Sequence, residues 1–192
     1  MIRQEQKFFL NPEERSYFLS YFNAFMHYPP RRVNSIYFDD SNFNSYKDSE
    51  EGTVPRKKYR LRWYGNTMNI PKEAALEIKT THAKYKTKEV FKIKNFKKLD
   101  GLFFKITKKQ LHPVCSISYD RLYYINRDNI RFTYDTNITS NKLGNNKIAL
   151  QNNIFEIKFN GDDKCEFTSL LGDANTRYSK YNEAMDILYN VG

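Results

Sequence analysis

The segment VPRKKYRLRWYG carries a cation at every second position, namely Arg56, Lys58, Arg60 and Arg62. Alternate residues of a β-strand point to opposite faces of a sheet, so these four side chains share one face. Like charges that lie side by side on a sheet repel each other, which favours an anion on this face. Arginine suits phosphate in particular, because its planar guanidinium group can bind two phosphate oxygens at once. The segment therefore predicts a phosphate-binding strand.

The same alternation occurs in the segments IRQEQKF, LEIK, SYDR, IRFTYD and FEIKF. Together the six segments place ten cations on their charged faces: Arg3, Lys7, Arg56, Lys58, Arg60, Arg62, Lys79, Arg121, Arg131 and Lys158. Four carboxylates accompany them: Glu5, Glu77, Asp135 and Glu156. For any one strand, a sheet face exposed to water is the simpler interpretation. The excess of cations over the whole set favours a polyanion site, in which the carboxylates hold Mg²⁺ or Mn²⁺ against phosphate oxygens.

Eight segments have the composition of β-strands. They are residues 2–9, 33–39, 57–64, 75–81, 87–94, 114–125, 130–137 and 154–159. Strands and helices do not alternate regularly, so we expect an α+β fold with a mainly antiparallel sheet. Eight strands can close into a barrel whose interior admits one small ligand. We therefore expect a closed eight-stranded antiparallel β-barrel, with the charged faces lining a basic tunnel and the helices packed outside.

The clearest helix is expected over residues 11–26, where Asn11 can cap the first turn and Pro12 suits the first helical position. Further helices are expected at residues 95–110, 163–171 and 176–190. Residues 41–55 and 139–152 are polar and are expected to be loops. The 192 residues show no break in composition, so we expect a single domain spanning residues 1–192.

The chain has a formal net charge of +10 and a pI of about 9.4, which favours an anionic partner. Its two cysteines, Cys115 and Cys165, form no metal-binding motif, and no apolar run has the length of a membrane span. Glu5 interrupts the N-terminal segment where a signal peptide needs an apolar core. We therefore expect a cytoplasmic protein, for which a role at a membrane would need another chain as partner.

Seven motifs in one order are similar to those of a known family. They are SIYFDD (35–40), RKKYRLRWYG (56–65), LEIK (76–79), SYDRLYYI (118–125), NIRFTYD (129–135), FEIKF (155–159) and RYSKY (177–181). In this order they resemble the VTC domain, the polyphosphate polymerase domain of the vacuolar transporter chaperone. That domain is a branch of the triphosphate tunnel metalloenzymes, also called CYTH-like proteins. The resemblance covers roughly residues 1–185.

The resemblance implies a tunnel of eight antiparallel strands that binds nucleoside triphosphate and polyphosphate together with Mn²⁺ or Mg²⁺. It assigns the catalytic cations to Arg60, Arg62, Lys79, Arg121, Arg131 and Lys180. Further phosphate contacts are expected from Lys7, Arg56, Lys58, Lys86, Lys158 and Arg177. The metal is expected on Glu156, with Glu77 as a second carboxylate. The first strand reads R-x-E-x-K, where the wider superfamily has E-x-E-x-K.

Three functions remain open. The first is transfer of the γ-phosphoryl group of ATP to a growing polyphosphate chain, and the second is hydrolysis of tripolyphosphate or a nucleoside triphosphate by the same site. The third is a non-catalytic module that binds polyphosphate or nucleic acid. The cations alternate along strands and do not cluster on loops, so we expect ATP and polyphosphate, and no nucleic acid, as partners.

Overall fold

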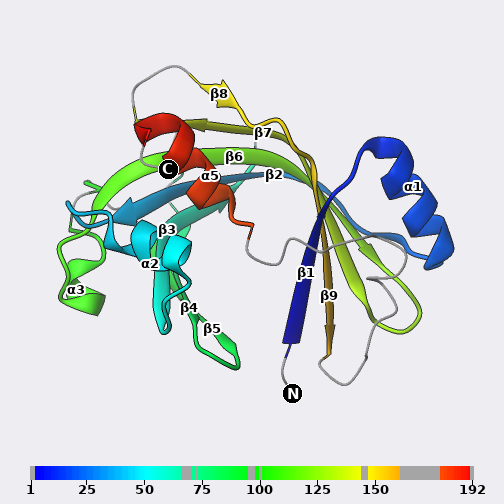
Figure 1. Ribbon diagram of the computed structural model, residues 1–192, viewed down its shortest axis with the longest axis horizontal. Helices are drawn as coiled ribbons and strands as arrows, with labels where there is room; N and C mark the ends of the chain where they lie inside the picture. Colours follow the sequence, from blue (N-terminus) through cyan, green and yellow to red (C-terminus); the bar gives the residue numbers. More distant parts are fainter. Residues whose placement is uncertain are drawn as a thin grey trace. The chain divides into compact units, whose positions relative to one another are not determined.

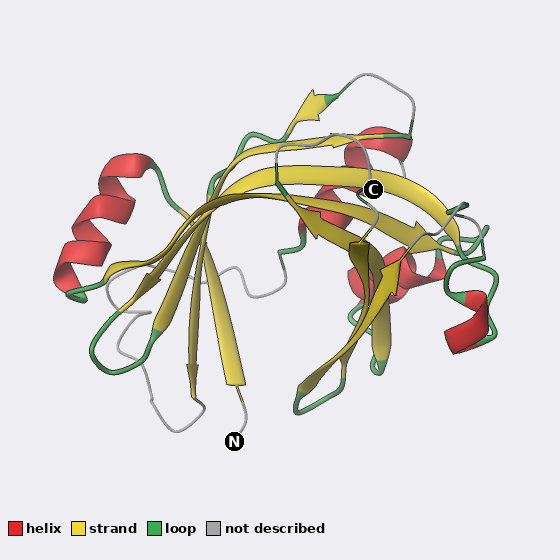
Figure 2. Ribbon diagram, turned by 180° about the vertical axis from the view of Figure 1, so that it is seen from behind, coloured by secondary structure: helices red, strands yellow, loops and turns green. Residues whose placement is uncertain are grey.

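The computed structural model describes residues 3–65, 71, 73–94, 98–99, 101–143, 147–160 and 178–190. Within these residues the chain forms nine strands and four helices (Figure 1). Strands make up most of the described chain, as Figure 2 shows in yellow. The α+β fold class predicted from the sequence is confirmed.

The strands pair in the order β1-β9-β7-β6-β2-β3-β4-β5. Their bounds are β1 Arg3–Phe9, β2 Phe25–Asp39, β3 Arg56–Tyr64, β4 Glu73–Thr81, β5 Lys86–Lys94, β6 His112–Ile125, β7 Arg131–Asn141 and β9 Ile154–Asn160. A two-residue strand, β8 (Ile148–Ala149), pairs with β7. The pairs β1–β9, β2–β3, β3–β4, β4–β5 and β7–β9 are antiparallel. Hydrogen bonding between the described strands does not join β1 to β5, so a closed barrel is not shown.

The chain divides into two compact units. Unit 1 consists of Met1–Arg32, Tyr119–Ile138 and Leu150–Tyr178, and unit 2 consists of Val33–Ser118, Thr139–Ala149 and Ser179–Gly192. The strands β2, β6 and β7 each contribute residues to both units. Each unit has a buried apolar face and a charged face on the strands that it contains.

The core of unit 1 is the apolar face of β1, β7 and β9, with α1 (Pro12–Tyr21) packed on it through Phe18. The helix begins as predicted: the Asn11 side chain accepts hydrogen bonds from the amides of Glu13 and Glu14, and the Glu14 carboxylate accepts one from the Asn11 amide. It ends at Tyr21 and not at residue 26, because Asn23 turns the backbone into the left-handed region (φ 50°) before β2 starts.

The core of unit 2 is the apolar face of β2, β3 and β4, closed by Phe103 and Leu111. Phe103 is fully buried and packs edge-on against Phe38 and Tyr59. The helix predicted at 95–110 is observed as one turn, α3 (Phe104–Thr107), which ends where Lys108 enters the left-handed region. Part of that prediction, residues 95–97 and 100, lies outside the described residues.

Further segments differ from the predicted elements, including the predicted loop 139–152, which contains the end of β7 and the strand β8. The helix α2 (Asn44–Glu51) occupies most of the predicted loop 41–55. The strand β2 starts eight residues earlier than predicted and runs through Pro29 and Pro30, a residue type that sheets seldom contain. The predicted helix at 176–190 is confirmed as α5 (Lys180–Tyr189), whereas the helix predicted at 163–171 lies outside the described residues.

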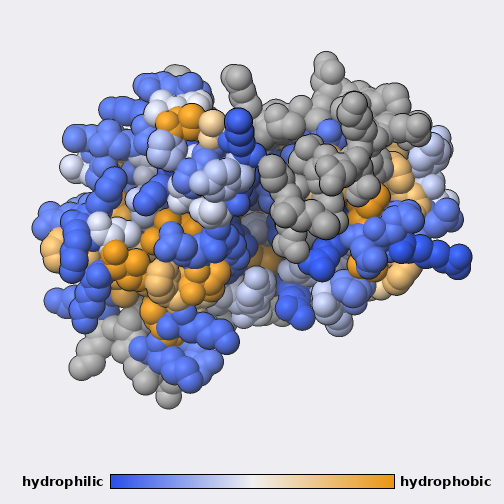
Figure 3. Space-filling view, turned by 90° about the horizontal axis from the view of Figure 1, so that it is seen from below, coloured by the Kyte–Doolittle hydropathy of each residue, from blue (hydrophilic) through white to orange (hydrophobic). Residues whose placement is uncertain are grey.

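Apolar side chains also reach the surface. Figure 3 shows them in orange among the hydrophilic side chains of one face. Among the exposed large apolar residues are Phe9, Phe25, Met26, Val54 and Val90. None of the described helices is long and apolar enough to cross a bilayer.

Candidate functional site

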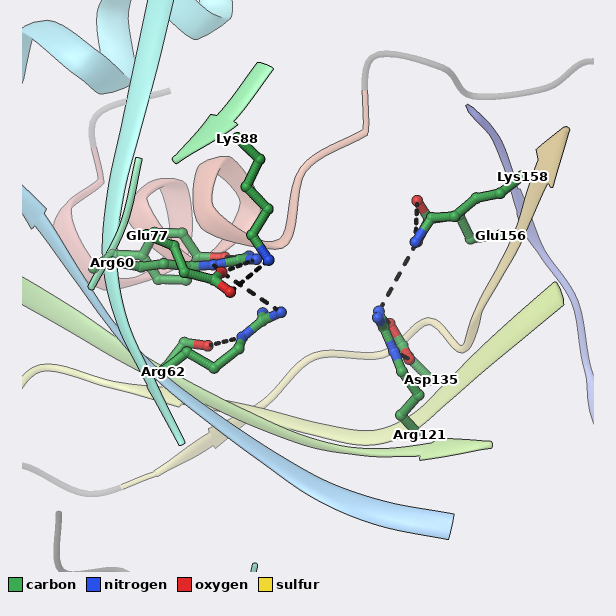
Figure 4. A network of polar contacts seen from close by, with 10 residues as sticks. Arg60, Arg62, Glu77, Lys88, Arg121, Asp135, Glu156 and Lys158 are labelled. Atoms are coloured by element: carbon green, nitrogen blue, oxygen red, sulfur yellow. Dashed lines mark hydrogen bonds and ion pairs between the residues drawn. The ribbon is translucent and has the colours of Figure 1, made fainter. Parts of the chain in front are cut away.

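The charged face of unit 2 is centred on Glu77 of β4. Glu77 lies directly opposite Arg60 in the β3–β4 pairing, and Arg60 binds it through Nε at 2.6 Å and Nη2 at 2.5 Å. Lys88 of β5 contacts the other carboxylate oxygen at 2.5 Å, and Arg62 approaches to 3.9 Å. Figure 4 shows these three cations turned toward Glu77. We call Arg60, Arg62, Glu77 and Lys88 the Glu77 cluster.

The Glu77 carboxylate is ionised although it is only 5% exposed. Burial opposes its charge, but Arg60, Arg62 and Lys88 outweigh burial and lower the pKa of Glu77 to about 2. One carboxylate thus stands among three cations, and the cluster keeps a net positive charge. The positive charges of these three side chains would repel a divalent cation near Glu77. The contacts therefore favour a role for Glu77 in orienting Arg60, Arg62 and Lys88.

Side chains of β2, which pairs with β3 on the edge opposite β4, bind Arg60 and Arg62. The Nε of Arg62 donates to Ser35 Oγ at 3.1 Å, and Nη1 of Arg60 donates to Tyr37 Oη at 3.3 Å. Sequence reasoning assigned no site role to Ser35. The alternation of Ser35, Tyr37 and Asp39 in SIYFDD could have indicated that all three share the charged face.

The start of α5 is bound to the same face of unit 2. The Lys58 ammonium donates to Ser179 Oγ at 2.7 Å and to Asn182 Oδ1 at 2.8 Å. The buried Asp39 accepts a hydrogen bond from Tyr181 Oη at 2.7 Å, and burial together with this carboxylate raises the pKa of Tyr181. Lys58, predicted to bind phosphate, therefore also fixes the helix that carries Lys180 as its first residue.

The other predicted cations of unit 2 differ in position. Lys79 lies between Lys58 and Lys88 in the pairing of β3, β4 and β5. Arg56 donates to the carbonyl oxygens of Gly52 and Thr53, on the turn before its own strand. Lys86 is exposed at the start of β5, and it is Lys88 that enters the Glu77 cluster.

Two carboxylates on the charged face of unit 1, Asp135 and Glu156, have different partners. Asp135 of β7 is fully buried and binds Arg121 of β6 through two hydrogen bonds, from Nε at 2.6 Å and from Nη2 at 2.7 Å. Glu156 of β9 lies 3.9 Å from Arg121 and 3.6 Å from Lys158 (Figure 4). We call Arg121, Asp135, Glu156 and Lys158 the Glu156 cluster.

Arg121 carries a permanent charge in this cluster. Burial opposes the charge, but Asp135, Tyr119 and Glu156 outweigh burial and raise the pKa of Arg121 well above its usual range. The guanidinium group also lies over the Tyr119 ring, 5.2 Å from its centre. Arg121 is thus held by Asp135 and Tyr119, and its orientation is set before any ligand arrives.

Strand pairing brings further predicted residues beside this cluster. Glu156 lies opposite Lys7 of β1 and Thr133 of β7, and Lys158 lies opposite Glu5 and Arg131. The Lys7 ammonium donates to the carbonyl oxygen of Tyr178 at 2.5 Å. Arg177, predicted to bind phosphate, lies outside the described residues.

A family model described as the VTC domain matches the chain over two segments, residues 3–105 and 94–189. The chain belongs to the VTC domain family. The resemblance found in the seven motifs is thereby confirmed. No curated protein matches the sequence of this VTC domain.

Solved structures share the fold of this VTC domain at low sequence identity. The PH1012 protein from Pyrococcus horikoshii OT3 is 14% identical, with a TM-score of 0.59 over 95% of this chain and 99% of its own. A conserved hypothetical protein from Pyrococcus furiosus is 19% identical, with a TM-score of 0.57 over the same shares. A Hippeastrum protein described as having a dominant triphosphatase activity is 10% identical, with a TM-score of 0.58 over 98% of this chain and 97% of its own.

Glu156 of this VTC domain suits a divalent cation that keeps most of its bound water molecules. The described residues contain no cluster of three or more His, Cys, Asp or Glu side chains that could hold a metal ion. Mg²⁺ commonly binds through one or two carboxylates, with waters and substrate phosphates as the other ligands. Glu156 fits this mode, and opposite it lies the buried hydroxyl of Thr133, which has no hydrogen-bond partner within the described structure. The residues present therefore fit Mg²⁺ or Mn²⁺ at Glu156.

Proposed function

We propose that this VTC domain is a metal-dependent phosphotransferase that transfers the γ-phosphoryl group of ATP to a growing polyphosphate chain. Membership of the VTC domain family supports this reaction. The observation that carries the proposal is the Glu77 cluster, in which one ionised carboxylate orients Arg60, Arg62 and Lys88 and leaves a net positive charge. Such preoriented cations stabilise a transferring phosphoryl group without having to reorganise during the reaction.

The expected eight-stranded tunnel is part of this proposal. Family membership supports it, as do the charged faces that alternate with buried apolar faces on β1, β3, β4, β7 and β9. The single domain over residues 1–192 and the cytoplasmic location also remain predictions, as does the need for another chain if the protein acts at a membrane.

The reaction needs no covalent intermediate on the protein. The terminal phosphate oxygen of the growing chain attacks the γ-phosphorus of ATP in line, the bond between that phosphorus and the β–γ bridging oxygen breaks, and ADP leaves with the electron pair. Six cations are proposed to stabilise the charge that develops: Arg60, Arg62, Lys79, Arg121, Arg131 and Lys180. A bound Mg²⁺ or Mn²⁺ would neutralise charge on the phosphate oxygens.

Binding of the long anion is assigned to a second set of cations. We propose phosphate contacts for Lys7, Arg56, Lys58, Lys86, Lys158 and Arg177. Glu156 would hold the metal ion. Glu77, the other predicted metal ligand, would orient the basic side chains of the Glu77 cluster. Because Lys58 also holds α5, loss of Lys58 would disturb both the phosphate contacts and the start of that helix.

Triphosphate hydrolysis is the second candidate function. The Hippeastrum protein, which shares the fold, is described as having a dominant triphosphatase activity. The same cations would serve this reaction, with water in place of the terminal phosphate of the chain as the acceptor.

Product analysis separates the two reactions. The wild-type chain is incubated with ATP and Mn²⁺, and the polymer is separated from orthophosphate on a gel. A ladder of growing polymer supports the polymerase, whereas orthophosphate alone supports the triphosphatase. If neither product forms, and if tripolyphosphate fails to displace a labelled polyphosphate while single-stranded nucleic acid succeeds, the binding module for nucleic acid is favoured instead.

A further inference from the structure

Thr133 of β7 has a buried side-chain hydroxyl group. The residue is 6% exposed, and within the described part of the chain its Oγ1 has no hydrogen-bond partner. Native structures rarely leave a buried hydroxyl unpaired, because such a group loses its water without gaining a partner. The arrangement therefore suggests that a ligand completes the bonding of Thr133.

The neighbours of Thr133 show which kind of ligand would fit. Phe132 and Tyr134, on either side of it in sequence, are buried in the apolar core of unit 1, so the Thr133 side chain lies on the opposite, charged face. Glu156 is its direct partner in the β7–β9 pairing. Side chains at such paired positions have their Cβ atoms about 5 Å apart, so a small ion can reach the Thr133 hydroxyl and the Glu156 carboxylate together.

We propose that Thr133 Oγ1 is a second protein ligand of the divalent cation held by Glu156. This inference rests on the proposed function, because it places the metal at Glu156. A neutral hydroxyl adds an oxygen ligand without adding charge, and Ser or Thr hydroxyls bind Mg²⁺ in this way in P-loop proteins. The Glu156 carboxylate favours a metal ion at this point because it attracts a cation, whereas Arg121 and Lys158, 3.9 and 3.6 Å from it, favour the phosphate oxygens that would share that ion.

The test measures Mn²⁺ binding by electron paramagnetic resonance of the free ion, with and without tripolyphosphate. The Thr133→Val variant keeps the shape of the side chain and removes the oxygen, so we expect about tenfold weaker Mn²⁺ binding. The Thr133→Ser variant keeps the oxygen, and we expect its affinity to stay within about twofold of the wild type. A matched control is Thr136→Val, the same substitution three residues along β7, and urea unfolding confirms that each variant is folded.

The outcomes separate this inference from the proposed function. The inference is overturned if Thr133→Val binds Mn²⁺ as tightly as the wild type while Glu156→Gln loses the ion. If Glu156→Gln also keeps its affinity, or if the wild-type chain binds no Mn²⁺ under either condition, both the inference and the proposed metal site are wrong. Formation of polyphosphate from ATP by the wild-type chain, measured in parallel, tests the proposed function independently of Thr133.

Discussion

The Glu77 and Glu156 clusters both arise from alternating charges on antiparallel strands, yet they differ in how their carboxylates are used. In the Glu77 cluster, Arg60 and Lys88 contact one carboxylate at hydrogen-bond length. In the Glu156 cluster, Asp135 takes two short bonds from Arg121, whereas Glu156 lies 3.6 Å from Lys158 and 3.9 Å from Arg121. Alternation alone therefore does not fix a carboxylate's role, which depends on which cations reach it and at what distance.

This difference suggests that the two clusters bind different ligands. The Glu77 cluster has three cations for one carboxylate and suits a phosphate group. In the Glu156 cluster, Asp135 balances Arg121, and Glu156 stands opposite the Thr133 hydroxyl, which has no hydrogen-bond partner among the described residues. The second arrangement suits a metal ion that is shared with phosphate. Four substitutions test this contrast, beginning with the largest expected effect.

Replacing Arg121 by Ala should destabilise the protein most. The fully buried Asp135 would lose two short hydrogen bonds from a guanidinium group, and breaking a buried ion pair typically costs about 3–5 kcal/mol. Urea unfolding measures the loss. The double variant Arg121→Ala with Asp135→Ala should regain part of it, because no buried charge is then left behind. A loss below about 1 kcal/mol in the single variant would show that the pair does not hold this cluster together.

Replacing Arg60 by Ala should impair catalysis more than folding. One preoriented donor to a developing anion is worth about 10²–10³ in kcat. The change in the free energy of unfolding should be smaller than for Arg121→Ala, because Glu77 keeps its contact with Lys88. Lys57→Ala is the matched control, since Lys57 is the exposed neighbour of Lys58 on the other face of β3. Unchanged turnover of ATP or tripolyphosphate in Arg60→Ala would show that the Glu77 cluster is not part of the catalytic site.

Replacing Glu77 by Gln should give a pH-dependent loss of stability, about 2 kcal/mol at pH 7. The pKa of Glu77 is lowered to about 2 in the folded protein, whereas an unfolded glutamate titrates near 4.5. The stabilisation by its charge is therefore fully present above about pH 4.5 and is lost as the pH falls toward 2. Urea unfolding of both proteins between pH 3 and pH 7 should show the difference shrinking below pH 4.5, and a constant difference would contradict this electrostatic account.

Replacing Lys94 by Ala should have the smallest effect. Lys94 forms an ion pair of 2.9 Å with Glu73, but both side chains are about 70% exposed. Exposed ion pairs are screened by water and salt and contribute little to stability. We expect the midpoint of urea unfolding to stay unchanged. A clear shift would mean that surface charge, and not burial, determines which ion pairs matter in unit 2.

The sequence predicted the charged and apolar faces of the strands well, because alternation is a local property. The start of α1 was also predictable, since Asn11, Pro12 and Glu14 are neighbours in sequence. The helix α2 was missed because its cap comes from further away: the Asp39 carboxylate accepts hydrogen bonds from the amides of Ser45 and Tyr46. No local pattern reveals such a cap.

The composition of the candidate site depended on long-range pairing that the sequence does not show. The register of β4 and β5 decides that Lys88, and not Lys86, reaches Glu77. Docking of α5 decides that Lys58 binds Asn182. The motifs therefore predicted which strands carry the alternating charged residues, and the structure was needed to assign partners among them.

The assignment of the metal to Glu156 is tested most directly by Mn²⁺ binding to two matched variants, Glu156→Gln and Glu77→Gln. Each substitution removes one buried carboxylate charge and keeps the size of the side chain. We predict that Glu156→Gln weakens Mn²⁺ binding at least about tenfold and that Glu77→Gln binds within about twofold of the wild type. Loss of Mn²⁺ binding in Glu77→Gln, with the ion retained by Glu156→Gln, would contradict the account.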